Sequence, residues 1–253
     1  MNEYPSLEPY PSEPRPRYVR VNVPMLTPYM TYGLLAVTVI AYLLQMASLL
    51  LLREDWLYLL GVKFGPLIRE GQVWRLITPV FLHGSIWHIA WNMYALYSLG
   101  RGLEARFGHG RFLLLYFLSA YAGNVLSFLL IPNPSLGAST AIFGLLAAEG
   151  IFLYQNRALL GNQASRAIGN IVMVAGVNLF FGFVNPGIDN WGHVGGLIGG
   201  LLFAWFGGPR WKVEGIFPSL YLTDERQGHG VLAGTAAVLL LFIPLAAVGF
   251  LFH

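Results

Sequence analysis

Long apolar segments alternate with short polar ones along almost the whole 253-residue chain. A helix that crosses the hydrocarbon core of a membrane needs about 20 consecutive, mostly apolar residues. The pattern therefore predicts an all-α polytopic membrane protein. Segments that approach this length cover about 27–52, 84–103, 112–131, 139–154, 167–184, 191–206 and 231–250.

The polar remainder suggests how the chain is divided. Residues 1–26 hold six prolines among mixed charges, which favours an extended cytoplasmic tail over a helix or a signal peptide. Residues 53–78 are charged and aromatic, which is typical of ordered structure at a membrane surface. We expect a six-helix core over 27–208 that includes this outer loop, a cytoplasmic linker over 209–228 and a seventh transmembrane helix over 229–253.

Composition narrows the function classes. Hydrophobic residues make up 56% of the chain and charged residues 11%, whereas soluble domains carry roughly 25% charged residues. The formal net charge of +3 is too small to suggest a nucleic-acid partner. The absence of cysteine excludes disulfides, thiolate metal sites and cysteine nucleophiles. The lipid bilayer is the expected surrounding, and no cofactor is expected.

The distribution of Lys and Arg predicts the orientation. With an internal N-terminus, 11 of the 15 basic residues fall in internal segments and four in external ones. Because cytoplasmic loops carry an excess of Lys and Arg, this bias predicts a cytoplasmic N-terminus and an external C-terminus. We expect a multi-pass protein of the plasma membrane.

Polar residues gather where the second, fourth and sixth segments begin. His83, His88 and Asn92 stand at the second, Ser139 at the fourth and His193 at the sixth. All three segments run from outside to inside in the predicted orientation, so these residues share the outer layer of the membrane. Polar side chains are costly there and indicate function.

Ser139 and His193 suggest hydrolytic chemistry. A serine hydroxyl becomes a nucleophile when a base takes its proton, and histidine has a suitable pKa. Gly137 ends a proline-containing loop that delivers the serine to a helix N-terminus, where negative charge is favoured. Small residues four apart, including Gly196, would let the histidine helix approach Gly144 on the serine helix closely.

His88 and Asn92 are four residues apart and therefore share one helix face. Both can donate hydrogen bonds, which suits the stabilisation of an oxyanion. Structural alternatives stay open, since such residues also serve as helix caps and interhelical hydrogen-bond partners. A zinc site of His83, His88 and His193 is conceivable, but no HxxxH or HExxH spacing supports it, and we expect no metal.

Taken together, these residues resemble the rhomboid family of intramembrane serine proteases. The resemblance spans about 27–208 and rests on Trp74-Arg75, on His83 with 88–92 (HIAWN), on 102–108 (GLEARFG), on 137–139 (GAS) and on 192–196 (GHVGG).

The resemblance implies that Ser139 is the nucleophile and His193 the base, without an acidic third member. It further implies an oxyanion hole made of His88, Asn92 and the Ser139 backbone N–H, with Phe143 stacked on the base. The implied substrates are single-span membrane proteins cut near the outer face. The seventh helix is similar to the extra C-terminal helix of some members.

One position departs from the family pattern, in which a glycine usually follows the serine. Thr140 stands there, and we expect its β-branched side chain to crowd the histidine helix. A catalytically impaired, rhomboid-like protein that binds membrane helices is therefore the alternative. A transporter is disfavoured because no repeated pair of broken helices occurs. Glu149 has no assigned role, with Asn178 or water as possible partners, and the oligomeric state is not predicted.

Overall fold

The computed structural model describes residues 26–251. The predicted tail over 1–26 lies almost entirely outside the described residues. Long helices follow the predicted apolar segments closely, which confirms the mostly helical fold class. They are α1 (Tyr29–Leu52), α4 (Ile86–Phe107), α5 (His109–Leu130), α6 (Ser139–Gln155), α8 (Asn162–Val184), α9 (Asn190–Gly207) and α10 (His229–Leu251).

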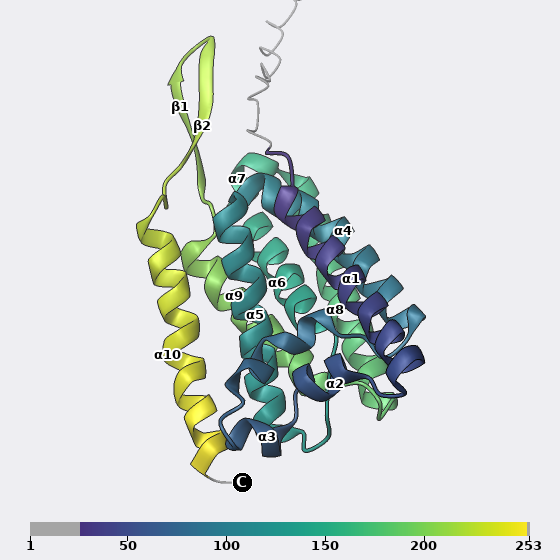
Figure 1. The fold of residues 1–253 in the computed structure, drawn as a ribbon. Helices are drawn as coiled ribbons and strands as arrows, with labels where there is room; N and C mark the ends of the chain where they lie inside the picture. The colour runs from purple at the N-terminus through teal and green to yellow at the C-terminus, as the bar shows by residue number, and fades with distance from the viewer. Residues whose placement is uncertain (1–25, 252–253) are drawn as a thin grey trace, which may run out of the picture.

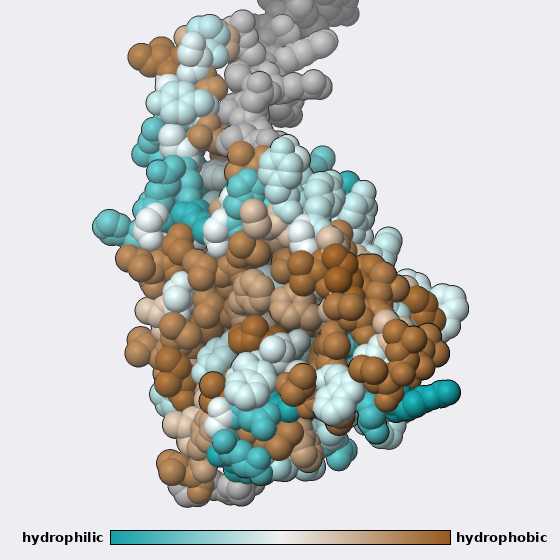
Figure 2. Space-filling model, in the orientation of Figure 1, coloured by the Kyte–Doolittle hydropathy of each residue, from teal (hydrophilic) through white to brown (hydrophobic). Residues whose placement is uncertain are grey.

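The outer surface of the helix bundle suits a bilayer. Figure 2 shows a broad hydrophobic band between two more hydrophilic ends. Four helices within residues 26–251, namely α1, α5, α8 and α10, are long and apolar enough to cross a membrane, and α6 is a shorter apolar helix. The number of helices that span the membrane stays a prediction.

The loop between α1 and α4 is largely helical and lies at the end of the bundle opposite α7 (Arg157–Leu160) (Figure 1). Arg75 is buried at its centre and donates hydrogen bonds to the carbonyls of Val62 (2.8 Å) and Leu59 (2.6 Å). The guanidinium therefore holds the turns of this loop together. These are α2 (Trp56–Gly61), α3 (Gly65–Arg69) and the 3₁₀ turns η1 (Val73–Leu76) and η2 (Thr78–Phe81).

Lys63 fastens the same loop to the bundle. Its side chain is fully buried, and its ammonium donates hydrogen bonds to the carbonyls of Ile131 (2.9 Å) and Asn133 (2.8 Å) just beyond α5. Its backbone pairs with that of Ser135 in an isolated β-bridge. Burial lowers the pKa of Lys63 to about 8, an effect that Asp189 partly opposes. Lys63 thus fixes the loop that leads into α6.

α5, α6 and α9 form the centre of the bundle, and the contact between α6 and α9 depends on glycine. A Cβ atom at Gly200 would lie 2.4 Å from the Cα of Gly144, and one at Gly196 would lie 2.0 Å from the carbonyl oxygen of Thr140. The two backbones therefore touch directly, as the spacing of small residues predicts.

Buried charged side chains join other helices at the end of the bundle opposite the outer loop. Glu104 in α4 is fully buried and accepts hydrogen bonds from the backbone N–H groups of Met30 (2.8 Å) and Thr31 (2.7 Å), which ties α1 to α4. Glu149 forms an ion pair with Arg106. This pairing corrects the suggestion that Asn178 is its partner: the amide of Asn178 instead donates to the carbonyl of Val174 in its own helix.

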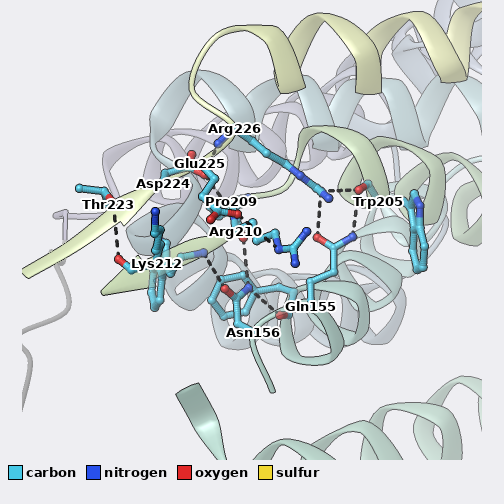
Figure 3. A network of polar contacts seen from close by, with 12 residues as sticks. Gln155, Asn156, Trp205, Pro209, Arg210, Lys212, Thr223, Asp224, Glu225 and Arg226 are labelled. Atoms are coloured by element: carbon cyan, nitrogen blue, oxygen red, sulfur yellow. Dashed lines mark hydrogen bonds and ion pairs between the residues drawn. The ribbon is translucent and has the colours of Figure 1, made fainter. Parts of the chain in front are cut away.

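The predicted linker over 209–228 contains an antiparallel hairpin of β1 (Trp211–Ile216) and β2 (Ser219–Asp224), which sequence analysis missed. The hairpin projects from the bundle at the end where α7 lies (Figure 1). Asn156 holds the base of the hairpin: its amide donates to the Pro209 carbonyl (3.1 Å) (Figure 3). Its side-chain oxygen accepts from the backbone N–H of Trp211 (2.8 Å).

Candidate active site

Ser139 and His193 are brought together across the contact between α6 and α9. The Oγ of Ser139 lies 2.9 Å from the Nε2 of His193. α6 begins at Ser139, directly after a loop in which Gly137 adopts φ +126°, a conformation that favours glycine. The N–H of Gly137 donates to the Pro79 carbonyl (2.9 Å), so the outer loop positions the residues before the serine.

The surroundings of His193 fix its ring. Phe143, one turn along α6 from Ser139, stacks on the imidazole with ring centroids 4.2 Å apart and planes 12° from parallel. The carboxylate of Asp189 caps α9 by accepting the N–H of Gly192 (2.8 Å), and the Ser127 hydroxyl donates to the same carboxylate. The Nδ1 of His193 has no hydrogen-bond partner among residues 26–251.

His88 and Asn92 face the loop that precedes Ser139. A Cβ atom at Gly137 would lie 2.7 Å from the Nε2 of His88 and 3.7 Å from the Nδ2 of Asn92. α4 is capped just before them, since the Ser85 hydroxyl accepts the N–H of His88 (3.2 Å). Both side chains can therefore direct hydrogen-bond donors to the space beside the serine.

His83 also contacts the loop that precedes Ser139. Its ring packs edge-on against that of His88, with centroids 4.9 Å apart, and its Nε2 accepts the N–H of Ala138 (3.4 Å). Because its Nε2 accepts this hydrogen bond, that nitrogen carries no proton. In the described part of the chain, no three His, Cys, Asp or Glu side chains are grouped so that they could hold a metal ion.

A cavity of about 870 Å³ opens in front of these residues. α4 contributes His88 and Asn92 to its lining, and α8 contributes Val174 and Asn178. Ser139 and His193 both line it. The cavity is large enough to admit water and an extended stretch of polypeptide to the serine hydroxyl.

Thr140 is accommodated by glycines on two other helices. A Cβ atom at Gly123 in α5 would lie 2.7 Å from the Cβ of Thr140, and one at Gly192 would lie 3.1 Å from its Cγ2. The methyl and methine groups of Thr140 therefore occupy space that these residues leave empty. Its hydroxyl is buried and has no partner among residues 26–251.

Sequence reasoning missed three residues that support the site. Asp189 caps the helix that carries His193, and Lys63 fastens the outer loop to the bundle. Gln45 in α1 accepts the N–H of His83 with its Oε1 (3.0 Å). Asp189 was detectable, because an aspartate immediately before a glycine-rich apolar run is a helix-start signal. Lys63 and Gln45 act through tertiary contacts that leave no local pattern.

Comparison with known proteins gives consistent matches. The family model described as the Rhomboid domain matches residues 70–210. The Rhomboid protease GluP of Bacillus subtilis is 41% identical over 178 residues, which cover 70% of this chain and 34% of that protein. The Rhomboid-like protease 3 of Toxoplasma gondii is 35% identical over 149 residues, covering 58% of this chain and 57% of that protein.

A third relative is a plant protein. The RHOMBOID-like protein 7 of Arabidopsis thaliana is 37% identical over 143 residues, 56% of this chain and 45% of that protein. The chain thus spans between about a third and somewhat more than half of the length of these relatives. The matched region contains α4 to α9 and every residue that faces the cavity.

Proposed function

Because the chain belongs to the rhomboid family and is a multi-pass integral membrane protein, we propose that it is an intramembrane serine protease. In this proposal Ser139 is the nucleophile and His193 is the general base. The observation that carries it is the 2.9 Å separation of the serine hydroxyl from the imidazole Nε2, at the edge of a cavity inside an apolar bundle.

The proposed reaction begins with proton transfer from the Ser139 hydroxyl to the Nε2 of His193. The serine oxygen attacks the carbonyl carbon of the scissile peptide and forms a tetrahedral intermediate. The imidazolium then returns the proton to the leaving amine, and the peptide C–N bond breaks to leave an acyl-enzyme. Water repeats the sequence: His193 takes its proton, the ester is hydrolysed, and Ser139 recovers its hydrogen.

The negative oxygen of the intermediate needs hydrogen-bond donors. We assign this role to His88, Asn92 and the backbone N–H of Ser139, which is one of the N–H groups that a helix N-terminus leaves without an intrahelical partner. In other enzymes the loss of one such donor costs ~10²–10³ in rate. His83 and Gly137 hold the loop in place, Phe143 orients the base, and Gly196 allows the two helices to meet.

The proposed substrates are proteins with a single transmembrane span, cut near the outer face of the plasma membrane. With the N-terminus in the cytoplasm and the C-terminus outside, the cavity lies in the outer half of the bilayer. The proposal treats 27–208 as the catalytic core, 53–78 as its outer loop, 209–228 as a cytoplasmic connection and 229–253 as an added transmembrane segment.

The test combines a serine-directed fluorophosphonate with cleavage of a transmembrane reporter, both on the purified full chain. We expect Ser139→Ala to abolish labelling and to reduce cleavage to background, while size-exclusion profile and thermal unfolding stay unchanged. Ser119→Ala is the matched control, because it removes a buried helical hydroxyl that, unlike that of Ser139, has no hydrogen-bond partner among residues 26–251. Cleavage that persists in Ser139→Ala would remove this serine from the mechanism.

The same experiment distinguishes the alternative function. A catalytically impaired protein that binds membrane helices would retain the reporter without cutting it and would resist the fluorophosphonate. Thr140 motivates this alternative, but the glycines at 123 and 192 leave room for its side chain. We therefore favour the protease.

A further inference from the structure

A second cavity lies at the end of the bundle away from Ser139. It is a groove of about 660 Å³ between the C-terminal halves of α6 and α9 and the N-terminal half of α8. Its lining is almost wholly apolar, and small residues are prominent in it: Ala147 and Gly150 on α6, Ala175 and Gly176 on α8. The protease mechanism uses none of these residues.

The groove exists because α8 is loosely attached to the bundle. Among its 23 residues only Ala164 and Gly182, near its two ends, are buried. Asn190 at the start of α9 holds the Gly182 end, where its amide donates to the Leu179 carbonyl (2.9 Å). Between these attachments nothing in the described part of the chain fills the space next to Gly176.

Aromatic and basic side chains stand at the mouth of the groove. The rings of Tyr154 and Trp205 both line it and stack with centroids 6.1 Å apart. The guanidinium of Arg157 sits 4.3 Å above the centre of the Tyr154 ring. Tyrosine and tryptophan at this depth are typical of a membrane–water interface. Figure 3 shows the carbonyl of Trp205 held by Gln155 and Arg226.

The charge at this mouth is not neutralised by the protein. Arg106, Arg111, Arg210 and Lys212 at the same end of the bundle each have a carboxylate within 4 Å. Arg157 is exposed and has no such partner among residues 26–251, and the same is true of Arg166 near the start of α8. An apolar groove with unneutralised arginine at its mouth complements an amphiphile with an anionic head.

We propose that this groove binds an acyl chain of an anionic phospholipid, with the phosphate at Arg157. Basic pockets between transmembrane helices are known to bind anionic headgroups. The unneutralised guanidinium of Arg157 favours a lipid over an apolar helix as the occupant, because a lipid phosphate would pair with it.

Occupancy of this groove has a consequence for the other cavity. α8 lines both, with Gly176 and Val172 facing the groove and Val174 and Asn178 facing the space in front of Ser139. A lipid chain beside Gly176 would support α8 at a position where a Cβ atom would meet no other part of the described chain within 4 Å. The lipid is therefore expected to limit how far α8 moves away from α6.

The experiment measures lipid retained by the purified full chain, using native mass spectrometry after reconstitution with phosphatidylglycerol or with phosphatidylcholine. We expect one tightly retained phosphatidylglycerol and weaker retention of phosphatidylcholine. Arg157→Gln should lower phosphatidylglycerol affinity about fivefold, the factor that corresponds to roughly 1 kcal/mol per basic residue at an anionic surface. Gly176→Leu should fill the groove and abolish retention.

Two matched controls make the result specific. Arg101→Gln removes an exposed arginine at the same end that stacks on Tyr97, away from the groove. Gly169→Leu adds the same side chain to α8 at an open position that does not line the groove. Neither control should alter retention. Ala175→Leu is a second groove-filling variant, and it decides the question if Gly176→Leu does not fold.

Brominated phosphatidylglycerol gives an independent readout, because bromine on an acyl chain quenches nearby tryptophan fluorescence. The part of the fluorescence quenching that is lost in Trp205→Phe comes from lipid in the groove. This part of the quenching should also disappear in the groove-filling variants. Equal retention of both lipids, equal losses in variants and controls, or a dimer that excludes lipid would each overturn the proposal. None of these outcomes depends on protease activity, so a failure here is distinct from a failure of the proposed function.

Discussion

Replacement of Gly196 by alanine tests the contact on which the proposed chemistry depends. Gly196 lies one turn beyond His193 on α9, opposite Thr140, the residue that follows Ser139. An added Cβ would lie 2.0 Å from the carbonyl oxygen of Thr140. The clash is with main chain, so no side-chain rotation can relieve it.

The size of the effect follows from this distance. An ordinary contact starts near 3.4 Å, so α6 and α9 must move apart locally by about 1.4 Å. Since His193 and Ser139 lie within one turn of the clash, most of this displacement reaches their 2.9 Å hydrogen bond and breaks it. A misplacement of about 1 Å can reduce rate ~10²-fold. Overpacking itself costs ~1–3 kcal/mol of stability.

The assay compares initial rates of reporter cleavage and of fluorophosphonate labelling, with thermal unfolding as the measure of stability. Gly169→Ala is the matched control, because it makes the same substitution inside a helix, at a position that lines neither cavity and where an added Cβ would meet nothing within 4 Å in the described part of the chain. We expect Gly196→Ala to lose ~10² in both rates and the control to retain activity.

Two outcomes would refute this reasoning. If Gly196→Ala cleaves and labels as fast as Gly169→Ala, close backbone contact does not set the geometry of Ser139 and His193. If labelling is unchanged and only cleavage falls, the substitution impairs access of the substrate rather than activation of the serine. Loss of both rates in a protein that still unfolds cooperatively supports the argument.

Two further predictions concern residues beside the site. Phe143→Leu removes the ring stacked on His193, an aromatic pair that contributes ~0.5–1.5 kcal/mol. Reporter cleavage should therefore slow several-fold in Phe143→Leu and keep its rate in Phe143→Tyr. Equal cleavage rates in the two variants would contradict a role of this ring in orienting the base. Burial lowers the pKa of Lys63 to about 8, so between pH 8 and 10.5 the unfolded chain binds more protons and stability should rise with pH by up to ~3 kcal/mol. Melting temperatures against pH should show this rise, and Lys63→Met should remove it.

The helices were predictable because their apolar length encodes them directly, but their ends were less so. The second apolar segment was expected to end near 103, whereas α4 continues to Phe107. Glu104 and Arg106 interrupt the apolar pattern, yet both are paired, with backbone groups of α1 and with Glu149. A hydropathy pattern counts such residues as solvent-exposed because it contains no information about their partners.

The residues facing the cavity were predictable for a different reason. Ser139, His193, His88 and Asn92 are polar groups in segments otherwise filled by apolar or small residues, and such exceptions are rare. Their common depth was predicted from the alternating direction of successive apolar segments, and the count of Lys and Arg predicts that this layer is the outer one. The hairpin over 211–224 was missed because its strands are only six residues long and lie within a polar connection between two strong apolar signals.

The charge asymmetry that predicts the orientation has two physical origins in the folded chain. At the end near Ser139, two of the four basic residues, Lys63 and Arg75, are buried and bound to main-chain carbonyls, so they hold the outer loop together and present no charge to a membrane surface, while Arg53 is exposed without a carboxylate partner among residues 26–251. At the opposite end, Arg157 and Arg166 are exposed and have no carboxylate partner among residues 26–251. Since the cytoplasmic leaflet carries the anionic lipids, the free arginines and the apolar groove beneath them are best satisfied on that side. The proposed lipid site and the proposed orientation thus support each other, because reversing the chain would place the groove and the arginines at its mouth at the leaflet poorer in anionic headgroups.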